Sequence, residues 1–172
     1  MIFAYVAGQL VAHFSAFLLE QLVVARTLGR PTEILLGRPP RWKILRLIFP
    51  NYFRPLPENT QNRVKKQAEI QSGPISGEGL FLQAYAIVTS SPVVQARLDE
   101  FRNQYGFARN MSFAFLTSGM AILLAHQLGS HSVRLRWALI SFLVGIGLFY
   151  RYLKFFRQYS YELFVRYAEF VR

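Results

Sequence analysis

The stretch NMSFAFLTSGMAILLAHQLGSHSVRLRWALISFLVGIGLFY, residues 110–150, decides the fold. Its two apolar runs, 110–128 and 137–150, contain no Lys, Arg, Asp or Glu and are separated by GSHSVRLR. At a rise of about 1.5 Å per residue, the first run crosses a hydrocarbon layer of roughly 30 Å. The second run becomes long enough if the flanking Arg136 and Arg151 snorkel outward. Because the connection is short, we predict an antiparallel transmembrane hairpin.

A further apolar run lies near the N-terminus, AYVAGQLVAHFSAFLLEQLVVA at residues 4–25, with one acid and no basic residue. It lacks the basic start and the cleavage site of a signal peptide, so we predict a first transmembrane helix within 1–25. The 172 residues are 52% hydrophobic and 16% aromatic, which favours a membrane protein. The predicted fold class is an all-α integral membrane protein with three transmembrane helices. A small helical cytoplasmic segment follows the first helix, and a long extension follows the third.

Basic residues are distributed unevenly along the chain. Of the 20 Lys and Arg residues, 13 lie in 26–109, 2 in the hairpin loop and 5 in 151–172. The positive-inside rule then predicts a bacterial inner-membrane protein with its N-terminus outside and its C-terminus in the cytoplasm.

The middle segment, 26–109, begins with a basic and aromatic stretch rich in proline, RTLGRPTEILLGRPPRWKILRLIFPNYFRPLP. This composition is typical of a segment lying among anionic lipid headgroups, although packing on its own domain is the alternative. The net positive charge of the middle segment can serve to bind anionic lipid, to bind nucleic acid or only to set the membrane topology. The residues predicted to contact lipid headgroups are Arg41, Trp42, Lys43 and Arg46.

Three further elements are expected in the middle segment. A helix begins near Glu58, and GLFLQAYAIVTS forms either a helix or a buried strand. Ser91 before Pro92 is a typical helix start, and that helix continues into the second span.

The third span continues without Pro or Gly after Gly147, so its helix should project into the cytoplasm as 151–172. Aromatic and apolar residues recur there at a helical period. They pack either on the chain's own middle segment or on a partner protein. The residues of this aromatic stripe are Tyr152, Phe156, Tyr159, Leu163, Tyr167 and Phe170.

Among the polar residues of the first span are Gln9, His13 and Glu20. On a helix that turns about 100° per residue they share one narrow face. A carboxylate in a span faces protein or water, or snorkels from near the helix end. This face is predicted to line a pore or a subunit interface.

The hairpin has small and polar residues that favour helix association. Asn110 and Thr117 are seven residues apart on the second span, and Ser141 and Gly145 have small-xxx-small spacing on the third. Alternatively, Gln9 and His13 bond to Asn110 or Thr117 inside one protomer.

Catalytic signals are absent from the sequence. There is no cysteine, no pair of histidines at metal-binding spacing, no phosphate-binding glycine loop and no nucleophile elbow. We therefore expect no enzyme activity, no metal site and no cofactor.

The polar first helix together with IFPNYFRPLPENTQNRV, GEGLF and YGFARNMSFA resembles a group of uncharacterised small bacterial integral-membrane proteins. The similarity extends over nearly the whole chain and implies a bacterial source without an activity. In architecture, a transmembrane hairpin flanked by helices is similar to SLATT-type effectors and small CRISPR-associated membrane proteins of antiviral defence.

Two functions fit these features. The first is a homo-oligomeric membrane effector or pore, with the polar face of the first helix at the pore or subunit interface. The second is a scaffold that anchors a cytoplasmic complex through the basic segment and the aromatic C-terminal helix.

Overall fold

The computed structural model describes residues 2–40, 42–71, 73, 77–129 and 135–170. Every regular element in this part of the chain is a helix, which confirms the all-helical class. Three helices are long and apolar enough to cross a membrane, also as predicted.

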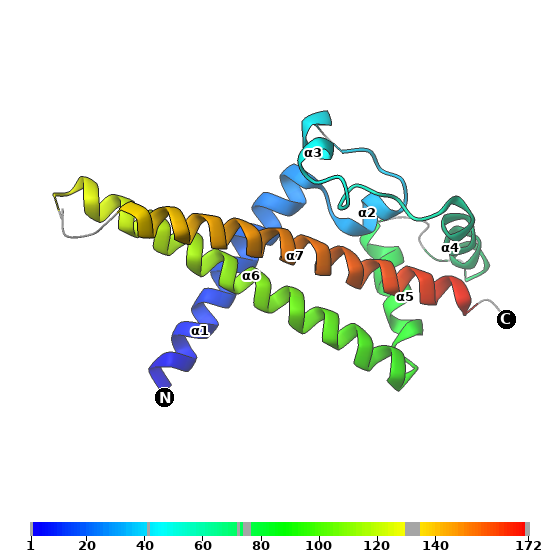
Figure 1. Ribbon diagram of the computed structural model, residues 1–172. Coiled ribbons are helices and arrows are strands. Elements are labelled where there is room, and N and C mark those ends of the chain that lie inside the picture. Colours follow the sequence, from blue (N-terminus) through cyan, green and yellow to red (C-terminus); the bar gives the residue numbers. More distant parts are fainter. Residues whose placement is uncertain (1, 41, 72, 74–76, 130–134, 171–172) are drawn as a thin grey trace.

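The longest elements are the two helices of the hairpin, α6 (Pro92–Gln127) and α7 (Leu135–Glu169). They run antiparallel and side by side (Figure 1). At standard rise each is about 50 Å long, well beyond a roughly 30 Å hydrocarbon layer. The expected continuation of both helices beyond the apolar hairpin is therefore confirmed. Each has one half in the apolar hairpin and one half outside it.

The first candidate span consists of α1 (Ile2–Ser15) and a π-helix, η1 (Ala16–Leu28). It crosses the hairpin rather than lying along it, and the N-terminal half of α1 extends away from the other helices (Figure 1). A π-helix bonds residue i to i+5 and so has wider turns than an α-helix. Its buried residues follow this wider period, and they are Leu19, Val24 and Leu28.

Short helices surround the non-hairpin half of α7: α2 (Pro31–Leu35), α4 (Glu58–Ile70) and α5 (Gly77–Val88) (Figure 1). The open choice between helix and strand after residue 77 is thus decided for a helix. We call this assembly the helical core. Its buried residues come from all of these elements, from the start of α6 and from the loop before α4; they are Leu35, Leu56, Val64, Ala68, Leu80, Ala84, Val88, Leu98, Tyr159, Leu163, Phe164, Tyr167 and Ala168.

The stretch between α2 and α4 holds α3 (Lys43–Ile48) and a loop that returns to α7. Tyr52 anchors this loop, because its hydroxyl donates a 2.8 Å hydrogen bond to the carbonyl of Gly29 at the end of η1. Burial raises the pKa of the Tyr52 hydroxyl far above its usual range. Tyr52 and Phe53 pack with Tyr152 and Leu153 of α7 in a second buried cluster.

Candidate functional site

Four polar residues meet where the first span crosses α6, and we call them the crossing cluster: Ser15, Glu20, Arg109 and Asn110. The Ser15 hydroxyl donates to Asn110 Oδ1 at 2.6 Å, and Arg109 Nη1 donates to Glu20 Oε2 at 2.6 Å. Arg109 also reaches Asn110 Oδ1 at 3.4 Å, which joins the two contacts into one network. The Arg109 side chain is 14% exposed and that of Glu20 is 32% exposed. The single acid of the first span is therefore charge-compensated within the chain.

Gln9 and His13 do not share the surroundings of Glu20, so the predicted common face is wrong. Both are exposed on α1, whereas Glu20 lies on η1 beside α6. The prediction used one angular step of 100° throughout, but the wider π turns after Ser15 rotate Glu20 out of that alignment. Within the described residues Gln9 forms no hydrogen bond, and His13 makes a ring contact with Phe14.

Of the four candidates in the hairpin, Gly145 makes the closest contact between the two helices. A Cβ added there would lie 2.9 Å from the Leu116 side chain, and the Ser112 hydroxyl donates to the Gly145 carbonyl at 2.8 Å. Ser141 is half-buried, and Thr117 is exposed and bonds to carbonyls of its own helix. Neither Asn110 nor Thr117 bonds to Gln9 or His13; Asn110 pairs with Ser15 instead.

The predicted headgroup-contacting residues lie around α3, which has no buried residue. Trp42, Lys43 and Arg46 are exposed, as are the apolar Ile44 and Leu47. Arg41 lies outside the described residues. The alternative of a loop packed on its own domain fits the parts of this segment on either side of α3, where Leu28, Ile34, Leu35, Tyr52 and Phe53 are buried.

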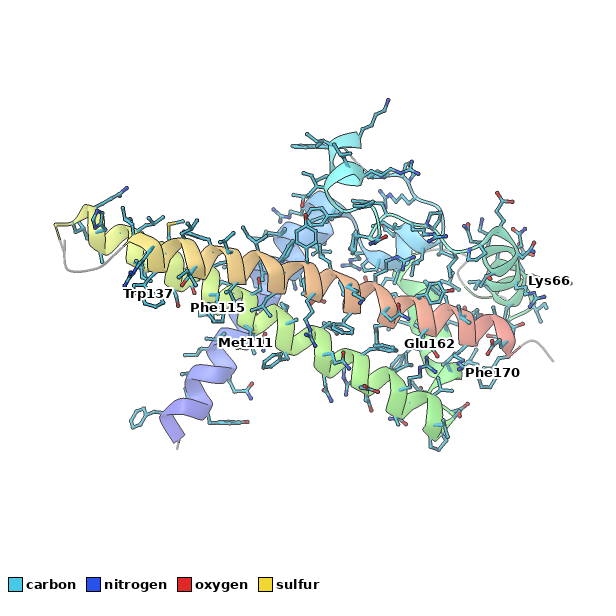
Figure 2. All side chains as sticks on the ribbon, in the orientation of Figure 1. Lys66, Met111, Phe115, Trp137, Glu162 and Phe170 are labelled. Atoms are coloured by element: carbon cyan, nitrogen blue, oxygen red, sulfur yellow. The ribbon has the colours of Figure 1, made fainter. Side chains whose placement is uncertain are left out.

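The aromatic stripe is mostly covered by the chain itself. Tyr152, Leu163 and Tyr167 are fully buried and Tyr159 is 8% exposed, in contact with the helical core or the loop before it. Figure 2 shows Phe170 at the end of the same half of α7, and it is the one stripe residue classed as exposed. The prediction that the stripe docks on a partner is therefore wrong for these buried residues, and the alternative of packing on the middle segment holds.

The sequence did not reveal the basic partners of the buried carboxylates. Glu162, labelled on α7 in Figure 2, is nearly inaccessible. It contacts Arg97 of α6 and Arg166 of α7, each at 3.2 Å. Arg109 is the corresponding partner of Glu20. Arg166 follows Glu162 by four residues, which is a local helical spacing, whereas Arg97 and Arg109 lie 65 and 89 residues from their carboxylates and leave no local pattern. One available signal was that Arg109 directly precedes the uncharged run of the second span.

No group of three or more His, Cys, Asp or Glu side chains suited to a metal ion occurs among the described residues. Comparisons with protein-family models, curated proteins and solved structures found no match. The candidate site therefore rests on the geometry of the crossing cluster and of the exposed face of α1.

The crossing cluster leads to a stability prediction. Arg109→Gln should lower the free energy of unfolding by about 2 kcal/mol, because it leaves the half-buried Glu20 carboxylate without its cation. Glu20→Gln should cost less, since Arg109 keeps Asn110 as an acceptor. The double variant should be more stable than the sum of the single changes predicts, as measured by SDS-induced unfolding in detergent micelles. Strict additivity would contradict a direct ion pair.

Proposed function

We propose that the protein is a homo-oligomeric membrane effector of the pore-forming or channel class, whose subunits meet through the outward face of α1. One observation carries the proposal: the apolar helix α1 presents Gln9 and His13 on a surface that no other described part of the chain covers. Polar side chains within a span normally face protein or water, because lipid offers them no hydrogen bonds. A second copy of α1 would supply a protein surface and hydrogen-bonding partners for Gln9 and His13.

Pairing within the protomer limits which residues can serve this interface. Glu20 is neutralised by Arg109 and Ser15 is bonded to Asn110, so the crossing cluster fastens η1 to α6. Gln9 and His13 remain for contacts between subunits or for a water-filled path. Large apolar side chains surround them and suit either lipid or a neighbouring helix; they are Phe3, Tyr5, Val6, Leu10 and Phe14.

The proposed location is the bacterial inner membrane, with the N-terminus outside and the helical core in the cytoplasm. The excess of Lys and Arg in 26–109 supports this orientation. We also propose a role in antiviral defence. It rests on the similarity in architecture to SLATT-type and small CRISPR-associated membrane effectors, in which a membrane hairpin is flanked by helices. The scaffold alternative is weaker, because most of the aromatic stripe that it needs is buried.

Oligomerisation can be tested by cysteine cross-linking, since the protein has no native cysteine. Gln9→Cys and His13→Cys should each give cross-linked oligomers in native membranes. Leu139→Cys, also exposed but on α7, is the matched control and should give far fewer. A monomeric mass in detergent, or equal cross-linking at all three positions, would contradict the proposal.

Pore formation needs a separate measurement. Reconstituted protein should release ions from liposomes, and His13→Ala and Gln9→Ala should reduce that flux by about tenfold while the oligomer persists. Thr117→Ala, which removes an exposed polar group from α6, is the control and should leave flux unchanged. Unchanged flux in the α1 variants would rule out a pore-lining role for these residues.

A further inference from the structure

A groove lined by four cations lies between the loop after α3 and the middle of α7. It comprises two adjoining cavities of about 680 and 650 Å³, which share Arg54, Arg157 and Gln158. Arg151 and Lys154 also line the larger cavity, and no acidic residue lines either one. Within the described residues, none of these four cations forms an ion pair with a carboxylate.

Arg151, Lys154 and Arg157 are held by neighbouring groups rather than by counter-charges. The guanidinium of Arg151 and the ammonium of Lys154 both lie over the ring of Phe155, at 5.3 and 6.0 Å. Arg157 Nη2 donates to the carbonyl of Arg54 at 2.8 Å, while its buried Nε has no partner among the described residues. Like charges gathered without an anion repel one another, so a bound anion would stabilise this arrangement.

One end of the groove is apolar and adjoins the hairpin. Phe49 and Tyr150 form its wall with ring centroids 4.8 Å apart, and the Tyr150 hydroxyl donates to the carbonyl of Ile48 in α3. Tyr150 ends the uncharged run of the third span, and Arg151 is the next residue. A membrane boundary therefore passes close to the groove if the hairpin spans the bilayer.

We propose that this groove binds the headgroup of an anionic phospholipid. The phosphate pairs with Arg54 and Arg157, Arg151 and Lys154 of the same cavity strengthen the positive potential around it, and an acyl chain follows Phe49 and Tyr150 toward the bilayer. Basic pockets at the cytoplasmic side of membrane helices suit such headgroups, and the volume is in the range of small-molecule sites. A free phosphate compound would satisfy the cations but not the apolar wall. The site is independent of oligomer formation and differs from the exposed face of α3.

The test is native mass spectrometry of the full chain in detergent, titrated with phosphatidylglycerol or phosphatidylcholine. We expect phosphatidylglycerol to bind at least tenfold more tightly. Arg54→Gln combined with Lys154→Gln should weaken its binding by about 25-fold, at roughly fivefold per cation. Lys65→Gln combined with Lys66→Gln removes the same charge from exposed positions of α4 and should change binding less than twofold. Figure 2 shows Lys66 on α4, and neither lysine lines the groove.

Three results would overturn the proposal: equal binding of the two lipids, equal losses in both double variants, or glycerol 3-phosphate binding as tightly as the lipid. The last would assign the groove to a soluble phosphate compound. If the Arg54 variant fails to fold, Arg151→Gln with Lys154→Gln gives the same comparison, because both side chains are exposed. Retained binding in that folded variant would likewise overturn the assignment.

Discussion

Leu163→Ala should destabilise the helical core by about 3 kcal/mol, within the range of truncations at fully buried leucines. Leu163 is fully buried on α7, in the cluster that joins α4, α5 and the loop residue Leu56. Removing its side chain loses apolar burial and leaves a cavity that the surrounding helices close only in part. Because Leu163 lies among residues from several elements of the helical core, the loss weakens their packing on α7.

Trypsin cleavage in α4 measures this effect. Arg63, Lys65 and Lys66 are exposed on that helix, but the helical backbone protects the peptide bonds beside them until the helix opens. The variant should be cleaved on the order of a hundredfold faster, if opening and closing are fast relative to cleavage. Leu143→Ala, at an exposed position of α7, is the control and should change the rate little. Equal rates in the two variants would show that α7 does not hold α4 in place.

The aromatic stripe shows what periodicity can and cannot predict. Spacings of three and four residues correctly predicted a buried helix face at Tyr159, Leu163 and Tyr167. They could not identify the surface that covers the stripe, because burial against any apolar surface of the same area gives a similar gain in hydrophobic free energy. α2, α4 and α5 cover the stripe, and their own short apolar patterns gave no indication of this packing.

For the first span, the predicted common face of the polar residues was wrong for a different reason. Its length and hydropathy identified it correctly as a candidate span, since those depend on composition alone. The face assigned to Gln9, His13 and Glu20 depended on a constant helical step, and η1 changes that step. The Glu20–Arg109 pair in turn depends on where η1 crosses α6, which no local sequence pattern determines.

For the hairpin, the sequence predicted the close approach of the helices but not the residues that face each other. Small residues at Ser141 and Gly145 predicted that the helices approach closely, and at Gly145 they do. The identity of the facing residues, Leu116 and Ser112, follows from the register of α6 against α7. That register is a property of the packing of the two whole helices, so a local spacing of small residues does not specify it.

Gly145→Val should weaken the pairing of α6 and α7 by about 3 kcal/mol, at the upper end of overpacking effects. A Cβ at this position lies 2.9 Å from the Leu116 side chain and 3.2 Å from its backbone nitrogen. The side chain can rotate away, but the backbone can only retreat with its helix. That retreat would also lengthen the hydrogen bond from the Ser112 hydroxyl to the Gly145 carbonyl.

Gly147→Val provides the matched control on the same helix, because a Cβ there meets nothing within 4 Å. SDS-induced unfolding should show a large loss of stability for Gly145→Val and a change below about 0.5 kcal/mol for Gly147→Val. Adding Leu116→Ala to Gly145→Val should restore part of the loss, since it removes the side-chain clash and leaves the backbone contact. Equal effects at the two glycines, or no rescue, would contradict this close approach. Partial rescue is the diagnostic result, because it separates the side-chain contact of Leu116 from the backbone contact that remains.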